Sequence, residues 1–255
     1  MVKIKKINYY LLFLLAAGGW LLVAAMAQSQ TPELEITLTW STNTYIPIDY
    51  TGKALPAKGS VIEVAANIDS KGINPQVLNF RWFIDGHLQK RESGDGKQVF
   101  KFPVKWLFTD RYFIRTEIRD SRENLLTTAY LTIKIVEPEI VILPTKRLSN
   151  RIKIEIPPLA NSTIAFKKYQ ILNNQEIEWT AQPYFFNIKN IDELNYNWSF
   201  SGENVSEDNP ENPNILTLKL GKLNKAIKRD TNLWVENKND RLQRAKSSVE
   251  VNIVP

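Results

Sequence analysis

The chain has 255 residues, of which 43% are hydrophobic and 24% charged, a composition typical of a folded globular protein and not of a disordered one. It contains no cysteine and one histidine, which excludes disulfides, thiolate metal sites and cysteine-based catalysis. The formal net charge is +6, but three lysines precede the first hydrophobic run, which leaves 30 basic against 27 acidic groups in the remainder. This balance argues against a nucleic-acid-binding protein.

The first predicted element is a targeting segment over residues 1–27. Its basic start is followed by an uncharged apolar stretch, residues 9–27. Ala25 and Ala27 form a small-x-small pattern before Gln28, which predicts signal-peptide cleavage after Ala27. As a helix with a rise of 1.5 Å per residue, the same stretch would cover about 28 Å, close to the thickness of a hydrocarbon core. An uncleaved membrane anchor is therefore the open alternative.

Both alternatives predict an exported protein. A retained segment would hold the chain in the membrane, with the lysines on the cytoplasmic side and the remainder facing outward. A cleaved segment would release the remainder as a secreted or periplasmic protein.

The residues after the targeting segment predict β-strands. Val, Ile, Thr, Tyr, Phe and Trp alternate with polar residues in short runs, and Pro, Asn, Asp and Gly gather between the runs. A period of two puts one face of a strand inward. The runs that show it are residues 34–40, 61–64, 99–102, 112–118 and 130–136. We therefore expect an all-β fold.

Three strand-like blocks recur later in the chain at nearly constant spacing, which indicates a duplicated domain. The spacing drifts by only a few residues, as expected when loops differ in length between copies. The paired blocks are 62–66 with 177–181 at a spacing of 115, 78–82 with 194–198 at 116, and 131–136 with 249–254 at 118.

The repeat predicts two tandem β-sandwich domains, residues 28–143 and residues 144–255. The boundary follows from the last strand of the first copy and from the polar, basic segment 144–150. The opening strand of the first copy, residues 34–40, is matched to residues 152–156 in the second.

The repeated blocks resemble PKD-like domains. Residues 80–86 and 196–202 look like the aromatic-x-Trp strand and glycine turn of that family, and residues 112–120 look like its later strand with Asp at a turn. The resemblance implies immunoglobulin-like β-sandwiches of extracellular or cell-envelope proteins. The second copy departs from the motif at Ser201, where the first has Asp85.

Trp82 and Trp198 are expected in the cores of the two sandwiches. Each lies two residues from an aromatic residue on the same strand, so alternation directs both rings to the buried face. A buried indole fills the space between two sheets. Ligand stacking is the alternative role for these tryptophans.

The sequence contains few residue patterns typical of enzymes, and we expect no catalytic residue, cofactor or metal site. The only histidine, His87, falls in a predicted hairpin turn, and no nucleophile motif accompanies it. One acidic loop offers hard oxygen ligands for calcium but lacks a regular calcium-binding spacing. The loop residues concerned are Glu203, Glu207, Asp208, Asn209 and Glu211.

The sequence therefore favours a non-catalytic extracytoplasmic module that binds another envelope or surface protein through sandwich loops or edges. A carbohydrate-binding or adhesion module is the alternative, and it requires an exposed Trp or Tyr. A glycan hydrolase is less favoured, because no spacing selects a pair of carboxylates.

Overall fold

The predicted targeting segment, with Ala25, Ala27 and Gln28, lies outside the residues that the structure describes. In the part of the chain that is described, no helix has the length and apolarity needed to cross a membrane. The computed structural model describes residues 34–69, 72–106, 110–144, 154–155, 167–172, 176–205 and 211–255.

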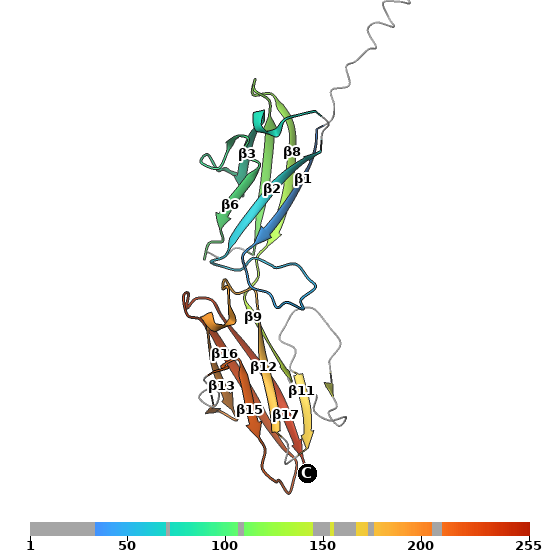
Figure 1. Ribbon diagram of the computed structural model, residues 1–255, viewed down its shortest axis with the longest axis vertical. Coiled ribbons are helices and arrows are strands. Elements are labelled where there is room, and N and C mark those ends of the chain that lie inside the picture. Colours follow the sequence, from blue (N-terminus) through green and yellow to red (C-terminus); the bar gives the residue numbers. More distant parts are fainter. Residues whose placement is uncertain are drawn as a thin grey trace, which may run out of the picture.

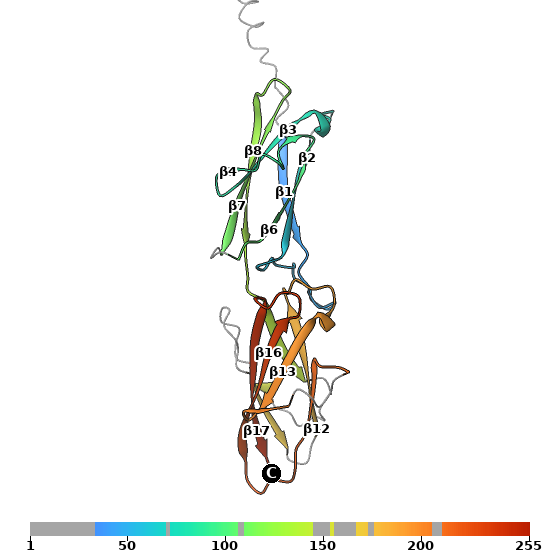
Figure 2. The ribbon, with the colours of Figure 1, turned by 90° about the vertical axis from the view of Figure 1, so that its left-hand side faces the viewer.

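The first half of the described chain forms a sandwich of two antiparallel β-sheets (Figures 1 and 2). One sheet has the order β1-β2-β6, with β1 (Glu35–Thr42), β2 (Val61–Asp69) and β6 (Val99–Pro103). The other has the order β4-β3-β7-β8, with β4 (His87–Leu88), β3 (Asn79–Ile84), β7 (Arg111–Arg119) and β8 (Leu125–Lys134). The short β5 (Gly94–Asp95) also pairs with β3, and the 3₁₀ turn η1 (Pro75–Val77) precedes β3.

The second half repeats this arrangement. Its smaller sheet has the order β15-β12-β9, with β15 (Ile215–Lys219), β12 (Glu176–Tyr184) and β9 (Glu139–Pro144). The larger sheet, β10-β11-β17-β16-β13-β14, contains β10 (Ile154–Glu155), β11 (Lys167–Leu172), β17 (Arg244–Val254), β16 (Ile227–Asn237), β13 (Leu194–Phe200) and β14 (Glu203–Asn204). The 3₁₀ turn η2 (Ile191–Glu193) precedes β13. The predicted fold class, two tandem immunoglobulin-like β-sandwiches, is confirmed.

Alternation along the strands builds a separate hydrophobic core in each sandwich. Trp82 and Trp198 are 0% and 2% exposed, each in the core of its own sandwich. Their indole N–H groups donate to the carbonyl oxygens of Lys97 and Pro213, at 2.8 and 3.0 Å. These acceptors lie at the same spacing from each tryptophan, so the two copies bury the indole in the same way.

The hairpin turn after each core tryptophan is also the same in both copies. Asp85 and Gly86 have φ values of 49° and 81°, and Ser201 and Gly202 have 52° and 88°. A two-residue turn with positive φ at both positions matches the twist of the strands that it joins. Serine therefore replaces aspartate at this position without changing the turn.

The opening strand of the second copy differs from the sequence match. β9 pairs antiparallel with β12, as β1 pairs with β2, so β9 takes the place of β1. Residues 154–155 instead form β10 and pair with β11, so the match of residues 34–40 to residues 152–156 was wrong. The domain boundary between residues 143 and 144 stays a prediction, although β9, which it cuts, pairs within the second sandwich.

The two sandwiches lie end to end (Figures 1 and 2), and the segment after β1 reaches across the junction. The Tyr45 N–H donates to the Phe186 carbonyl at 2.7 Å, and the Phe185 N–H donates to the Tyr45 carbonyl at 2.8 Å. The ring of Tyr50 packs edge-on against Tyr184, with ring centroids 5.5 Å apart. This segment of the first copy is thus bound to the second sandwich.

A polar network also crosses the junction, centred on the buried side chain of Gln243. Its Oε1 accepts from the Asn187 N–H at 2.8 Å and from Asn237 Nδ2 at 3.1 Å, while its Nε2 donates to the Lys58 carbonyl. Asn187 Nδ2 in turn donates to the Gly59 carbonyl at 2.9 Å. Because buried amides without partners are costly, these bonds favour one fixed arrangement of the two sandwiches.

Candidate functional site

The outer faces of the two larger sheets are the best candidates for contact with other molecules. In each copy, the residue that follows the core tryptophan points outward and lies beside one residue on each of the next two strands. We call these three side chains a row, and the strand register makes the rows of the two copies equivalent. The row is Phe83–Arg115–Tyr130 in the first sandwich and Ser199–Asn232–Ser248 in the second. The first sandwich therefore presents bulky groups where the second presents small polar ones.

We call the outer surface formed by Phe83, Phe113, Arg115 and Tyr130 the aromatic–arginine face. Tyr130 and Phe113 are 74% and 56% exposed, although both lie within regular strands. The Arg115 guanidinium carbon lies 3.8 Å from the centroid of the Phe83 ring. This cation–π contact holds the Arg115 guanidinium over the Phe83 ring, so a cationic group lies among the aromatic side chains of the face.

Ion pairs hold the charged groups around the face in place. Glu117 accepts from Arg115 Nη1 and from Arg119 Nη2, both at 3.0 Å. The hydrogen bond from Arg111 lowers the pKa of the Asp110 carboxyl, which therefore stays ionised beside the start of β7. The arginines are thus positioned before a partner arrives, which reduces the entropy lost on binding.

The composition of this face matches that of the centre of a protein interface. Tyr, Phe and Arg are enriched there, because they offer large contact areas with few freely rotating bonds or a planar set of donors. The paired strands beneath them fix their spacing, which adds preorganisation. The arrangement suits a partner that has apolar side chains next to carboxylates.

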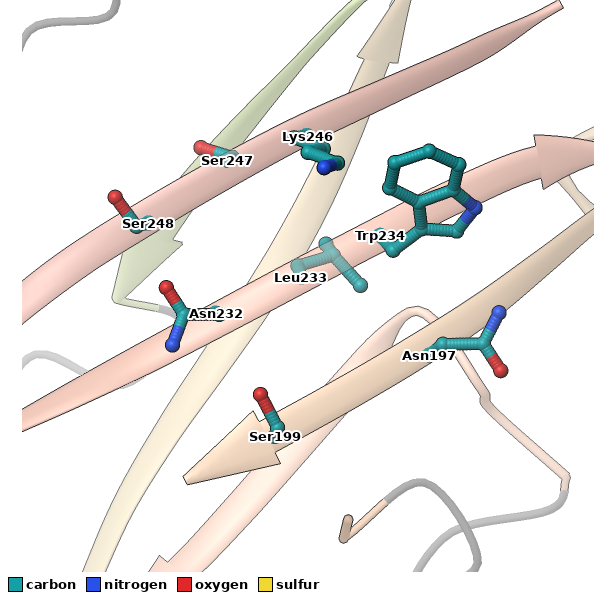
Figure 3. A pocket seen from close by; sticks show the side chains of 8 residues that line it. All are labelled: Asn197, Ser199, Asn232, Leu233, Trp234, Lys246, Ser247 and Ser248. Atoms are coloured by element: carbon teal, nitrogen blue, oxygen red, sulfur yellow. The ribbon is translucent and has the colours of Figure 1, made fainter. Parts of the chain in front are cut away.

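The second sandwich has a shallow hollow of about 490 Å³ on the corresponding sheet (Figure 3). Trp234, partly exposed on β16, lies at one end, between Asn197 on β13 and Lys246 on β17. The Lys246 Nζ is 4.4 Å and the Arg244 Cζ 5.2 Å from the centroid of the Trp234 ring. The hollow is lined by Asn197, Ser199, Asn232, Leu233, Trp234, Lys246, Ser247 and Ser248.

An indole next to amide and hydroxyl groups can stack on one face of a flat polar ligand and hydrogen-bond to its rim. The two cations near the ring would also attract a negatively charged group. A carbohydrate-binding module requires such an exposed aromatic ring beside polar groups, and here a single tryptophan provides the ring.

None of the residues singled out by the sequence forms part of these two surfaces. Trp82 and Trp198 are buried and cannot stack on a ligand. His87 is exposed at the start of β4, next to the hairpin turn. In the acidic loop, Glu203 and Glu211 are described and residues 206–210 are not. Among the described residues, no three His, Cys, Asp or Glu side chains gather as metal ligands would.

The sequence did contain a signal for the aromatic–arginine face. In the strand that begins at Arg111, Tyr112 and Ile114 point inward, so Phe113 must point outward. An aromatic residue at an outward position is unusual enough to mark a contact surface.

Comparison with known proteins identifies no family. No protein-family model matches the chain, and no curated protein matches it either. Three N-terminal domains of the bacteriophage RB49 highly immunogenic outer capsid protein align over 86% of this chain, with 12% identity and a TM-score of 0.42. The chain covers 59% of the length of that structure.

Two further solved structures are similar at a comparable level. The fibronectin(III)-like modules of Clostridium thermocellum CbhA have 14% identity and a TM-score of 0.28, over 86% of this chain and 93% of that one. The ICAM-5 D1–D4 ectodomain fragment has 10% identity and a TM-score of 0.30, over 86% and 53%. The assignment of an immunoglobulin-like fold therefore rests on the strand pairings described above.

Proposed function

We propose that the protein is a non-catalytic interaction module that binds another protein through the aromatic–arginine face. The observation that carries this proposal is the exposure of Tyr130 and Phe113 beside Arg115, which lies over the Phe83 ring, on regularly paired strands. The second copy of the same domain has small polar groups at the equivalent row. Large aromatic groups are therefore not needed there for the fold.

The setting of this interaction is proposed from the sequence. The targeting segment, residues 1–27, supports an extracytoplasmic location, either anchored in the membrane or released after cleavage. The resemblance to PKD-like domains supports a partner in the cell envelope or on the cell surface. Two sandwiches in fixed arrangement would hold the face at a defined distance from the membrane if the segment is retained.

The proposal is tested by placing a photo-crosslinking amino acid at Tyr130 in the natively expressed protein. The matched control carries the same amino acid at Ser248, the equivalent position of the second sandwich. We expect one adduct of defined mass from position 130 and none from position 248, and we expect Arg115→Ala to remove it. Identical patterns from both positions, or an adduct that survives Arg115→Ala, would contradict the proposal.

Glycan binding in the second sandwich is the second candidate, and the Trp234 hollow is the observation that favours it. If it operates, Trp234→Ala abolishes retention of the chain in affinity gels that contain polysaccharide, and Phe113→Ala leaves retention unchanged. The absence of retention of the unaltered chain on any neutral or acidic glycan tested would remove this candidate.

A further inference from the structure

The second sandwich contains a strand, β11, that has no counterpart strand among the described residues of the first. β11 pairs in parallel with residues 249–254 of β17, and it lies between β17 and the short edge strand β10. Its Tyr169 and Ile171 are 2% and 1% exposed, and they belong to the same core as Ile140 and Ile142 of β9. β11 therefore closes the side of the sandwich between the two sheets.

The equivalent edge of the first sandwich is open among the residues that the structure describes. β8 is the last strand of its sheet there. Beyond its pairing with β7, the stretch 131–136 makes one bridge, between Val136 and Ala57, and the Val136 N–H donates to the Pro56 carbonyl at 2.9 Å. We call this edge of β8, from Tyr130 to Lys134, the open edge.

The hydrogen bonds of β8 show which backbone groups lie on the open edge. The Ile135 N–H donates to the Asp110 carbonyl at 2.8 Å, across the β7–β8 pair. In an antiparallel pair, every second residue bonds to the neighbouring strand, and the residues between them direct their N–H and C=O groups to the opposite side. Tyr130, Thr132 and Lys134 therefore present donors and acceptors to an incoming strand.

Apolar side chains next to this edge are less covered than their counterparts. Strand register makes Ile36, Leu38 and Leu131 equivalent to Ile140, Ile142 and Val249. The three residues of the first sandwich are partly exposed, whereas the three of the second are buried in the core that contains β11. A strand on the open edge would cover this apolar side.

Among the described residues, only the end of the chain's own counterpart of β11 reaches this strand, where Ala57 bridges Val136 in parallel as Leu172 pairs with Val254. In the second copy, β11 follows β9 in the sequence; in the first, the segment after β1 holds the second sandwich through Tyr45 and Tyr50. Because this segment is bound to the second sandwich, it does not extend along residues 130–134 of β8, and the expected occupant of that edge is another chain.

From these observations we propose that the open edge accepts an extended segment of a different protein, which runs parallel to β8 with alternating apolar residues facing Ile36 and Leu38. The inference rests on the proposed function and deepens it, because Tyr130 belongs both to the aromatic–arginine face and to the open edge. The partner would thus bind with backbone hydrogen bonds at the edge and side-chain contacts on the face.

The probe for this proposal is a capped peptide with the sequence of residues 167–172, the strand that fills the equivalent place in the second sandwich. Amide hydrogen exchange of the full chain in detergent micelles is measured by NMR, with and without the peptide at millimolar concentration. We expect the amides of Tyr130, Thr132 and Lys134 to exchange about tenfold more slowly with the peptide. Unchanged exchange at all three would overturn the proposal.

Thr132→Pro is the decisive variant, because it removes an N–H from the open edge and leaves the bonds between β7 and β8 in place. Thr132→Val is the matched control, since it removes the hydroxyl and keeps the N–H. We expect the peptide to protect the Val variant and not the Pro variant; equal protection would overturn the proposal. If the Pro variant fails to fold, Leu38→Lys, which adds a charge beside the edge, is expected to abolish protection.

Other occupants give different results. Slow exchange of the three amides in a monomer without peptide would mean that another part of the same chain covers the open edge. A dimer that Thr132→Pro dissociates would mean that a second copy covers it. Either result overturns the proposal. The proposed function is tested separately, because crosslinking at Tyr130 that persists without peptide protection would retain the face and reject the edge.

Discussion

The two sandwiches share their cores and differ on their outer faces. Trp82 and Trp198 are buried against equivalent carbonyls, and both hairpins turn with positive φ. Across the neighbouring outer rows, the first sandwich has Phe83–Arg115–Tyr130 and Arg81–Glu117–Thr128, where the second has Ser199–Asn232–Ser248 and Asn197–Trp234–Lys246. The positions that the fold needs are therefore alike in the two copies, and the exposed positions differ.

The equivalence of the two cores is tested by the substitutions Trp82→Ala and Trp198→Ala. Each change leaves a large cavity and removes one buried hydrogen bond, so we expect each sandwich to lose about 3–5 kcal/mol in its free energy of unfolding. Urea unfolding of the two variants measures the effect. A loss in only one copy would show that the equivalence of the two cores does not extend to their energetics.

The difference between the outer faces predicts that substitutions at equivalent positions of the two sandwiches have different effects on partner binding. Tyr130→Ala is expected to weaken partner binding by about 2 kcal/mol or more, a value typical of an aromatic residue at the centre of an interface. Ser248→Ala should leave that binding unchanged. The yield of crosslinked adduct from Thr132, measured for both variants, decides between these outcomes, and equal yields would remove the asymmetry.

The junction that joins the two copies should be sensitive at Gln243. Gln243→Ala leaves the Asn187 N–H and the Lys58 carbonyl without their buried partner, at a cost of about 1–3 kcal/mol. We expect a broader distribution of distances between spin labels on the two sandwiches. Leu242→Ala, on the exposed neighbouring residue, serves as the control and should leave the distribution narrow.

The smallest expected effect concerns Glu193, whose carboxylate accepts from the N–H groups of Lys189 and Asn190 at 2.7 and 3.0 Å. These bonds lower its pKa below the ordinary value of 4.5. Its contribution to stability is therefore complete above pH 4.5 and is lost as the pH falls through the lower, folded-state pKa. In Glu193→Gln, unfolding by urea should depend less on pH in this acidic range.

Much of the fold could be predicted because alternation and repetition are local properties of the sequence. The blocks around Trp82 and Trp198 lie in equivalent strands, β3 and β13. Residues 139–143 of β9 fall within the predicted first domain, because nothing in that stretch of sequence shows which strand it pairs with. The sequence of a strand shows which of its side chains point inward, but which strand it pairs with depends on the rest of the chain.

The candidate site was harder to predict for the same reason. The outward position of Phe113 follows from alternation, but its proximity to Tyr130 depends on the register of β7 and β8. The open edge is further removed from the sequence, since it depends on where the segment around Tyr45 packs. Such features become visible only when the two copies are compared strand by strand.

The most direct test of the account transfers one row between the copies. A triple variant, Phe83→Ser, Arg115→Asn and Tyr130→Ser, gives the first sandwich the row of the second, while a photo-crosslinker at Thr132 reports on partner binding. We predict that the adduct disappears and that the free energy of unfolding changes by less than about 1–2 kcal/mol, because the replaced groups lie outside the core. An adduct formed in undiminished yield by the stable triple variant would contradict the account.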